Sequence, residues 1–190
     1  MKMYAETNRV ALDSNAMSYL IEALGSFSGP PTGNTAAEKI ALARCFLYRQ
    51  PETVFCITPT VSAEFSKIPD QERLSEHANW ALLHLQVLPK PSSTADLIFR
   101  TNTLNAFHSD VDDCRIVAEC EALDVNMLLT SDRKFCNAMN RVGTTVGVLS
   151  GQQYWNEMAV SPGETPMMEL HPDSPLNTAT WWKVCSDPSW

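Results

Sequence analysis

The stretch that decides the fold is VDDCRIVAECEALDVNMLLTSDRKF, residues 111–135. Apolar residues recur at helical spacing through its first half, which predicts a helix over residues 111–123. The apolar run 126–130 then predicts a strand that ends at Ser131 and Asp132, and a short helix follows through Phe135. This alternation is typical of a sheet in which helices connect parallel strands.

The rest of the chain repeats the alternation. Short apolar or β-branched runs predict strands over residues 9–12, 53–57 and 145–149. Between them, helical patterns cover residues 17–25, 36–48, 72–85 and 93–107, and a short helix after Pro59 carries Glu64. Strands separated by helices predict an α/β fold, a three-layer α/β/α sandwich with a mainly parallel central sheet.

Composition indicates one domain with an appended segment. The 190 residues, 44% of them hydrophobic, can form one core but are too few for two full-sized domains. We expect the domain to span residues 1–150. The Pro-rich segment 151–190 is expected to pack on the domain or to be partly disordered. Trp181 and Trp182 favour packing, because solvated tryptophans would expose much apolar surface, although they would also suit an exposed partner-binding anchor.

The charge and the amino terminus limit the class of protein. A net charge of −8 argues against a wide surface for nonspecific nucleic-acid binding, but a nuclease that binds divalent ions remains compatible with it. The sequence has no run long and apolar enough for a membrane span and no secretory signal, so we expect a cytoplasmic protein. The six cysteines form no CxxC pair and are expected to be reduced, and the histidines match no zinc pattern.

Four acidic residues stand near predicted strand ends or helix starts. Asp13 follows the first strand, Glu64 the second and Asp132 the strand 126–130, while Asp113 lies near the start of a helix. The carboxyl ends of parallel strands meet at one edge of the sheet, where ligands bind. Carboxylates gathered there would repel one another unless cations held them together. The sequence therefore predicts a divalent-metal site.

A simpler role exists for several of these residues. Helix N-capping alone would explain Asp13, Asp132 and one of the three residues Asp110, Asp112 and Asp113. Asp113 differs, because it falls within about 30° of the centre of the apolar face of its helix and should point inward. A buried carboxylate is costly unless it is paired or metal-bound. Whether Asp110 or Asp112 also contributes to the site stays open.

At four short motifs the chain resembles the PIN-domain family, metal-dependent ribonucleases that include the toxins of bacterial toxin–antitoxin pairs. The motifs are VALDSNAMSYL (10–20), TPTVSAEF (58–65), DDCRIVAECEAL (112–123) and LLTSDRKF (128–135). The resemblance covers residues 9–150 and places all four acidic residues in the family's order. Residues 26–35 and the segment after Gly151 match nothing in the family.

The resemblance implies an endoribonuclease that hydrolyses RNA phosphodiester bonds with Mg²⁺ or Mn²⁺, ions that prefer oxygen ligands and can activate water. Asp13 and Asp113 would be the principal catalytic metal ligands, and Glu64 and Asp132 would bind directly or through water.

Neighbouring polar residues would assist. Asn15, Thr130 and Ser131 are candidates to orient carboxylates or waters. Arg133 and Lys134 would either meet substrate phosphates or form a solvated face.

The resemblance also implies an RNA substrate, an antitoxin whose segment enters the acidic groove, and homodimer formation. Two alternatives come from other classes of protein. A phosphoryl-transfer enzyme with an aspartyl nucleophile, of the haloacid-dehalogenase kind, usually has a second Asp two positions after the first, where this chain has Asn15. A catalytically silent scaffold would use the acidic residues as caps and the tryptophan-bearing segment as an interaction arm.

Overall fold

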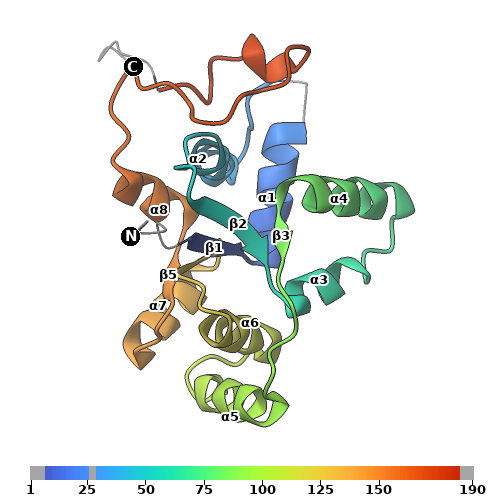
Figure 1. Cartoon of the computed structure of the whole chain (residues 1–190), viewed down its shortest axis with the longest axis vertical. Helices are drawn as coiled ribbons and strands as arrows, with labels where there is room; N and C mark the ends of the chain where they lie inside the picture. Colours follow the sequence, from blue (N-terminus) through green and yellow to red (C-terminus); the bar gives the residue numbers. More distant parts are fainter. Residues whose placement is uncertain (1–6, 26–28, 185–190) are drawn as a thin grey trace, which may run out of the picture.

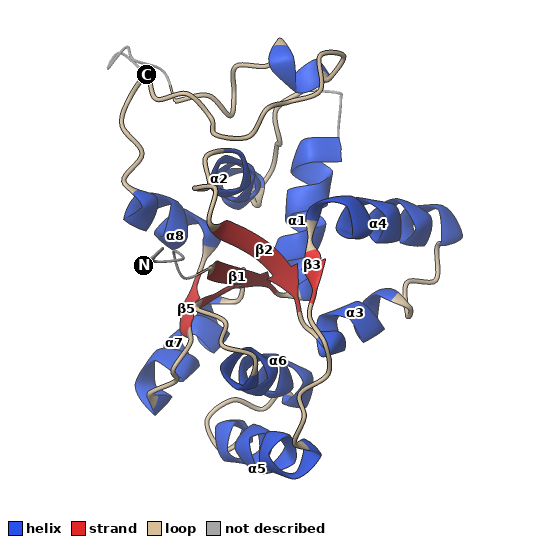
Figure 2. Cartoon of the chain, viewed as in Figure 1, coloured by secondary structure: helices blue, strands red, loops and turns tan. Residues whose placement is uncertain are grey.

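The computed structural model describes residues 7–25 and 29–184. Within these residues five strands form one parallel sheet in the order β3-β2-β1-β4-β5 (Figure 2). The strands are β1 (Asn8–Leu12), β2 (Thr53–Ile57), β3 (Gln86–Val87), β4 (Met127–Leu129) and β5 (Gly147–Leu149).

Helices cover both faces of this sheet. Figure 1 shows α1 and α2 on one face and α6 and α7 on the other, with α5 packed outside α6. The three-layer α/β/α architecture is thereby confirmed. The helices of the described residues are α1 (Ser14–Gly25), α2 (Ala36–Leu47), α3 (Pro59–Phe65), α4 (Gln71–His84), α5 (Thr94–Asn105), α6 (Val111–Ala122), α7 (Arg133–Val142), α8 (Gly151–Met158) and the 3-10 helix η1 (Pro175–Asn177).

The predicted helices and strands lie within a few residues of those observed, but strand β3 was not predicted. Its two residues, Gln86 and Val87, are both exposed and pair with the end of β2. A strand this short has no alternation of apolar and polar residues, so the sequence carries no signal for it. It forms because α4 ends at His84 and delivers the chain to the open edge of β2.

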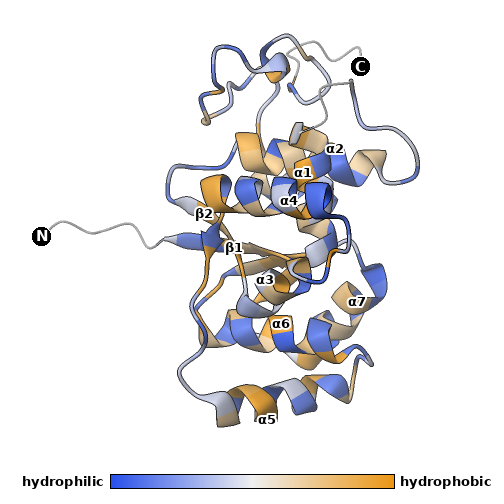
Figure 3. Cartoon of the chain, turned by 90° about the vertical axis from the view of Figure 1, so that its right-hand side faces the viewer, coloured by the Kyte–Doolittle hydropathy of each residue, from blue (hydrophilic) through white to orange (hydrophobic). Residues whose placement is uncertain are grey.

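The core lies between the sheet and its two helical layers. Val10, Ala11 and Leu12 of β1 are fully buried, as expected for a central parallel strand. Figure 3 shows the strands between α2 on one side and α6 on the other. The cysteines within the described residues are buried and free, and Cys185 lies outside these residues. No helix in the described part of the chain is long and apolar enough to cross a membrane.

The segment after α8 runs back over α2 (Figure 1). The guanidinium of Arg44 donates from Nε to the Trp182 carbonyl at 3.1 Å, and the backbone N–H of Val184 donates to the Tyr48 hydroxyl at 3.1 Å. Trp182 is 2% exposed, and its indole N–H donates to the Leu176 carbonyl at 3.0 Å. The described part of this extension is therefore attached to the domain by both hydrogen bonds and a buried aromatic ring.

The strand order has a reversal point at β1. The chain leaves β1 toward β2 on one side, and it returns to place β4 on the other side of β1. In open α/β sheets such a reversal point is where ligands bind. Asp13 follows β1 directly, and Thr130 follows β4 directly, so both lie at this point.

Candidate metal centre

Asp13 lies at the reversal point of the sheet, directly after β1. Its backbone N–H donates to the Leu129 carbonyl at 3.0 Å, which continues the pairing of β1 with β4. Its Oδ1 accepts the Ala16 backbone N–H at 2.6 Å, so the carboxyl also caps the first turn of α1. Asp13 is only 5% exposed. The capping bond accounts for the position of Asp13 at a helix start.

The surroundings of Asp13 disfavour its charged form. Burial, together with the nearby charges of Asp113 and Glu64, raises the pKa of Asp13 to about 7 against the opposing hydrogen bonds from Thr130 and Ala16. The charges of two of the other three predicted carboxyl groups therefore reach Asp13. A strongly raised pKa is typical of functional sites.

Asp113 differs from its acidic neighbours Asp110 and Asp112 in its contacts and its burial. The carboxyl of Asp110 caps α6 and accepts the backbone N–H groups of Asp112 and Asp113 at 2.9 and 3.2 Å. Asp112 is exposed. The Asp113 carboxyl is instead half-buried, and its Oδ2 lies 2.9 Å from Nε2 of His108.

Burial raises the pKa of Asp113, its hydrogen bond to His108 lowers it, and the charges of Asp110 and Asp132 raise it further. His108 therefore supplies the partner that the sequence did not reveal. It packs against Phe135 with ring centroids 4.9 Å apart. The position of His108 depends on the turn between α5 and α6, and no pattern in the sequence predicts the conformation of that turn.

Glu64 reaches the site from the end of α3. Its Oε2 accepts a hydrogen bond from the hydroxyl of Ser14, the residue next to Asp13. The side chain is half-buried. Ser14 was not among the predicted assisting residues, although it stands in the motif around Asp13. Asn15, which was predicted to assist, is exposed.

Asp132 lies at the rim of the site. Its carboxyl caps α7 by accepting the backbone N–H groups of Lys134 and Phe135 at 2.7 and 3.1 Å, and the residue is exposed. The fully buried Thr130 accepts the Asp132 backbone N–H at 3.0 Å and also hydrogen-bonds Asp13. Thr130 therefore connects the Asp13 carboxyl group with the backbone of Asp132. The other predicted neighbours are the half-buried Ser131 and the exposed Arg133 and Lys134.

The donor set fits a hard divalent cation in its chemistry. Mg²⁺ and Mn²⁺ prefer carboxylate oxygens, and within residues 7–25 and 29–184 the sole ion-pair partner of these four carboxyls is His108. The arrangement is not a closed cage, because no three His, Cys, Asp or Glu side chains of the described residues form a group that could hold a metal ion. An ion would need water-mediated contacts or a rotation of the carboxyl groups.

Comparisons with solved structures place this geometry in a known fold. VapBC-1 from nontypeable Haemophilus influenzae matches with a TM-score of 0.52 and 15% identity over 75% of this chain and 98% of that one. PAE2754 from Pyrobaculum aerophilum matches with a TM-score of 0.51 and 15% identity over 84% of this chain and 94% of that one. The chain has a PIN-domain fold. No protein-family model and no curated protein sequence matches it.

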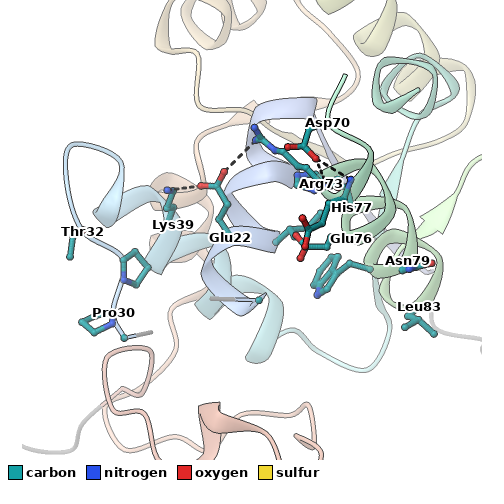
Figure 4. Close-up of a pocket in the computed structure, with 16 residues that line it drawn as sticks. Glu22, Pro30, Thr32, Lys39, Asp70, Arg73, Glu76, His77, Asn79 and Leu83 are labelled. Carbon is teal, nitrogen blue, oxygen red and sulfur yellow. Dashed lines mark hydrogen bonds and ion pairs between the residues drawn. The ribbon is translucent and has the colours of Figure 1, made fainter. Parts of the chain in front are cut away.

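The PIN fold of this chain also has a pocket of about 960 Å³ that none of the four carboxylates lines. Residues of α1, α2 and α4 surround it, and Figure 4 shows Glu22 between Lys39 and Arg73. The Glu22 carboxylate lies 2.7 Å from Nζ of Lys39 and 3.5 Å from Nη2 of Arg73. The four predicted carboxylates lie outside this pocket, at or near the carboxyl edge of the sheet, so we place the candidate chemistry there rather than in the pocket.

Proposed function

We propose that this protein is a divalent-metal-dependent endoribonuclease that hydrolyses RNA phosphodiester bonds. The observation that carries the proposal is the burial of Asp13 at the reversal point of the sheet, with its pKa raised to about 7 by burial and by the charges of Asp113 and Glu64. Mutually repelling carboxyl groups are costly to gather without a compensating cation. The PIN-domain fold supports the same class of activity.

In this mechanism Asp13 and Asp113 would hold Mg²⁺ or Mn²⁺, and Glu64 and Asp132 would contribute directly or through water. A bound ion would supply an acidified water and would stabilise the charge that develops on the phosphate. The chain's own residues orient the carboxylates: Thr130 and the Ala16 N–H act on Asp13, His108 acts on Asp113 and Ser14 acts on Glu64.

In this proposal the exposed side chains at the start of α7 contact the RNA substrate. Arg133 and Lys134 directly follow Asp132 and form no ion pair with any other described residue. Both cations are therefore free to meet RNA phosphates, which bind Arg and Lys through charge-assisted hydrogen bonds.

A protein partner is part of the proposal. We infer that the chain acts as the toxin of a toxin–antitoxin pair in the cytoplasm, that a segment of an antitoxin enters the acidic groove, and that the chain pairs as a homodimer. The acidic groove would favour an antitoxin segment with basic side chains. Expression of the chain alone should arrest growth, and purification after co-expression with the neighbouring gene should yield a complex. Absence of both results would contradict the toxin role.

The nuclease proposal is tested by cleavage of a labelled panel of single-stranded RNAs with Mn²⁺ or Mg²⁺, with and without EDTA. The wild type should cut, and EDTA or the substitution Asp113→Asn should abolish cutting. Asp112→Asn is the matched control, because Asp112 is the exposed neighbour on the same helix. Equal activity of the Asp113→Asn variant and the wild type would show that Asp113 is not part of the site.

Two observations favour a second candidate, a catalytically silent PIN-fold scaffold. No group of three metal-ligand side chains is assembled among the described residues, and Asp13, Asp132 and Asp110 all make helix-capping bonds. A scaffold would bind neither Mn²⁺ nor Mg²⁺. Metal titration by calorimetry separates the two candidates, because the nuclease proposal requires binding.

A further inference from the structure

A buried carboxylate that is not one of the four predicted ligands joins the two helices α3 and α6. Glu119 lies on α6, and its side chain is 1% exposed. Its Oε2 accepts the Thr60 backbone N–H at 3.0 Å, and its Oε1 accepts the Thr60 hydroxyl at 2.8 Å. Arg115 contributes a weaker contact, with Nε 3.5 Å from Oε1. Both carboxylate oxygens are therefore used by one residue of α3.

The two helices that Glu119 joins carry two of the candidate ligands. Asp113 stands on α6, six positions before Glu119, and Glu64 stands on α3, four positions after Thr60. Helix α3 has only seven residues, and isolated helices of that length are not stable on their own. The position of Glu64 relative to Asp113 therefore depends on what holds α3 against α6.

We propose that Glu119 and Thr60 form a positioning pair that fixes the Glu64-bearing helix relative to the Asp113-bearing helix, and so sets the spacing of the metal-binding carboxylates. This inference rests on the proposed function. Neither residue touches the reacting atoms, so both act through Glu64. A glutamine at position 119 lacks the charge that strengthens both hydrogen bonds: its oxygen can accept the Thr60 N–H, but its amide group must then donate to the Thr60 hydroxyl, which weakens the pair.

The test measures Mn²⁺ affinity by calorimetry and RNA cleavage by kinetics in Glu119→Gln, Thr60→Val and Thr60→Ser. Removal of contacts that orient ligands commonly costs about 10-fold in metal affinity or more. We expect at least that loss in Glu119→Gln and Thr60→Val, and recovery in Thr60→Ser, which keeps the hydroxyl. The control Glu121→Gln alters a similar contact on the same helix, with Arg100 and Thr145 rather than α3, and should leave Mn²⁺ affinity unchanged.

A double-variant comparison separates positioning from general damage. In a Glu64→Gln background, Glu119→Gln should cause no further loss of Mn²⁺ affinity, because its effect passes through Glu64. A full additional loss there, or an equal loss in Glu121→Gln, would overturn the proposal.

Hydrogen exchange tests the positioning role independently of the proposed function. If the wild type neither binds Mn²⁺ nor cuts RNA, the proposed function fails, and amide exchange of α3 then decides whether the pair fixes this helix. Glu119→Gln and Thr60→Val should speed amide exchange in residues 60–65 at least 10-fold, while exchange in α2 stays as in the wild type. Unchanged exchange in α3 would overturn the positioning role on its own.

Discussion

Asp13 shows how burial changes the chemistry of one carboxyl group. In the unfolded chain its pKa is near the ordinary value of 3.8, whereas in the folded protein it is raised to about 7. The folded state therefore binds more protons than the unfolded state between these pH values. The contribution of Asp13 to stability is fully present below about pH 4 and is lost as the pH rises through about 7.

The first prediction follows for the metal-free protein. The free energy of unfolding should fall between pH 4 and pH 7, with a slope for one proton of at most about 1.4 kcal/mol per pH unit. Asp13→Asn has no charge to bury and should remove this part of the slope. Urea unfolding at a series of pH values, in EDTA, measures it. The same slope in both proteins would contradict the burial effect.

The second prediction concerns His108. His108→Phe keeps an aromatic ring against Phe135 but removes the hydrogen bond to Asp113. Mn²⁺ affinity should fall about 10-fold, because a freed carboxylate is no longer held in one orientation. His171→Gln is the control, since His171 faces Asp173 in the exposed extension. Calorimetry measures the Mn²⁺ affinity of both variants. Equal affinities of the two variants would show that His108 is not part of the site.

At the scale of elements, α2 and α8 are joined by a second buried carboxyl group. Glu38 of α2 accepts the Gly151 backbone N–H at 2.5 Å at the start of α8, where Ser150 and Gln153 also form a capping box. The helices approach so closely that a Cβ on Gly151 would lie 2.7 Å from Cγ of Leu42. The close packing therefore requires glycine at this position.

The third prediction tests this contact. Gly151→Ala should lower the free energy of unfolding by about 1–3 kcal/mol, as overpacking of a tight interface does. Gly25→Ala is the matched control, because a Cβ there meets nothing within 4 Å, and its effect should stay within about 0.5 kcal/mol. Urea unfolding of both variants provides the comparison. A neutral Gly151→Ala would show that α8 can shift away from α2.

Elements were the most predictable level of this structure, for physical reasons. Long periodic segments such as α6 bury one face, so their pattern shows directly in the sequence. The cap residue of α6 was ambiguous among Asp110, Asp112 and Asp113, and only the loop geometry selects Asp110. Strand β3 gave no signal because it forms through an edge contact alone.

At the scale of the whole molecule, the extension adds a layer beyond the sheet and its helices. Trp182 is buried beside Tyr48, with ring centroids 6.3 Å apart, whereas Trp181 is only partly buried. The pair of tryptophans in the sequence predicted that the extension packs on the domain. Nothing in their spacing indicated that α2 is the surface they contact. That choice depends on Arg44, whose guanidinium reaches the carbonyls of both tryptophans.

The fourth prediction concerns this attachment. Trp182→Ala should lower the free energy of unfolding by about 3–5 kcal/mol, the usual cost of truncating a buried aromatic residue. Trp181→Ala should cost clearly less. Urea unfolding followed by circular dichroism compares them. An equal loss in the two variants would contradict the distinction between the buried and the half-buried ring.

The positions of the acidic residues were easier to predict than the contacts that orient them. Asp13 directly follows β1 and Asp132 lies three residues after the end of β4, so topology alone brings both to one edge of the sheet. The contacts of Ser14 and His108 depend on the orientation of a helix start and of a turn. The periodicity of the sequence does not encode either orientation. Glu119 lies in the middle of a predicted helix, where only the packing of α3 against α6 reveals its partner.

The most direct test of the central claim is calorimetric titration of the metal-free protein with Mn²⁺ at pH 7.5 or above, where Asp13 is mostly deprotonated. We predict binding to the wild type, its loss in Asp113→Asn and its retention in Asp112→Asn. No heat of binding to the folded wild type, or equal binding by all three proteins, would contradict a metal site built from these carboxylates.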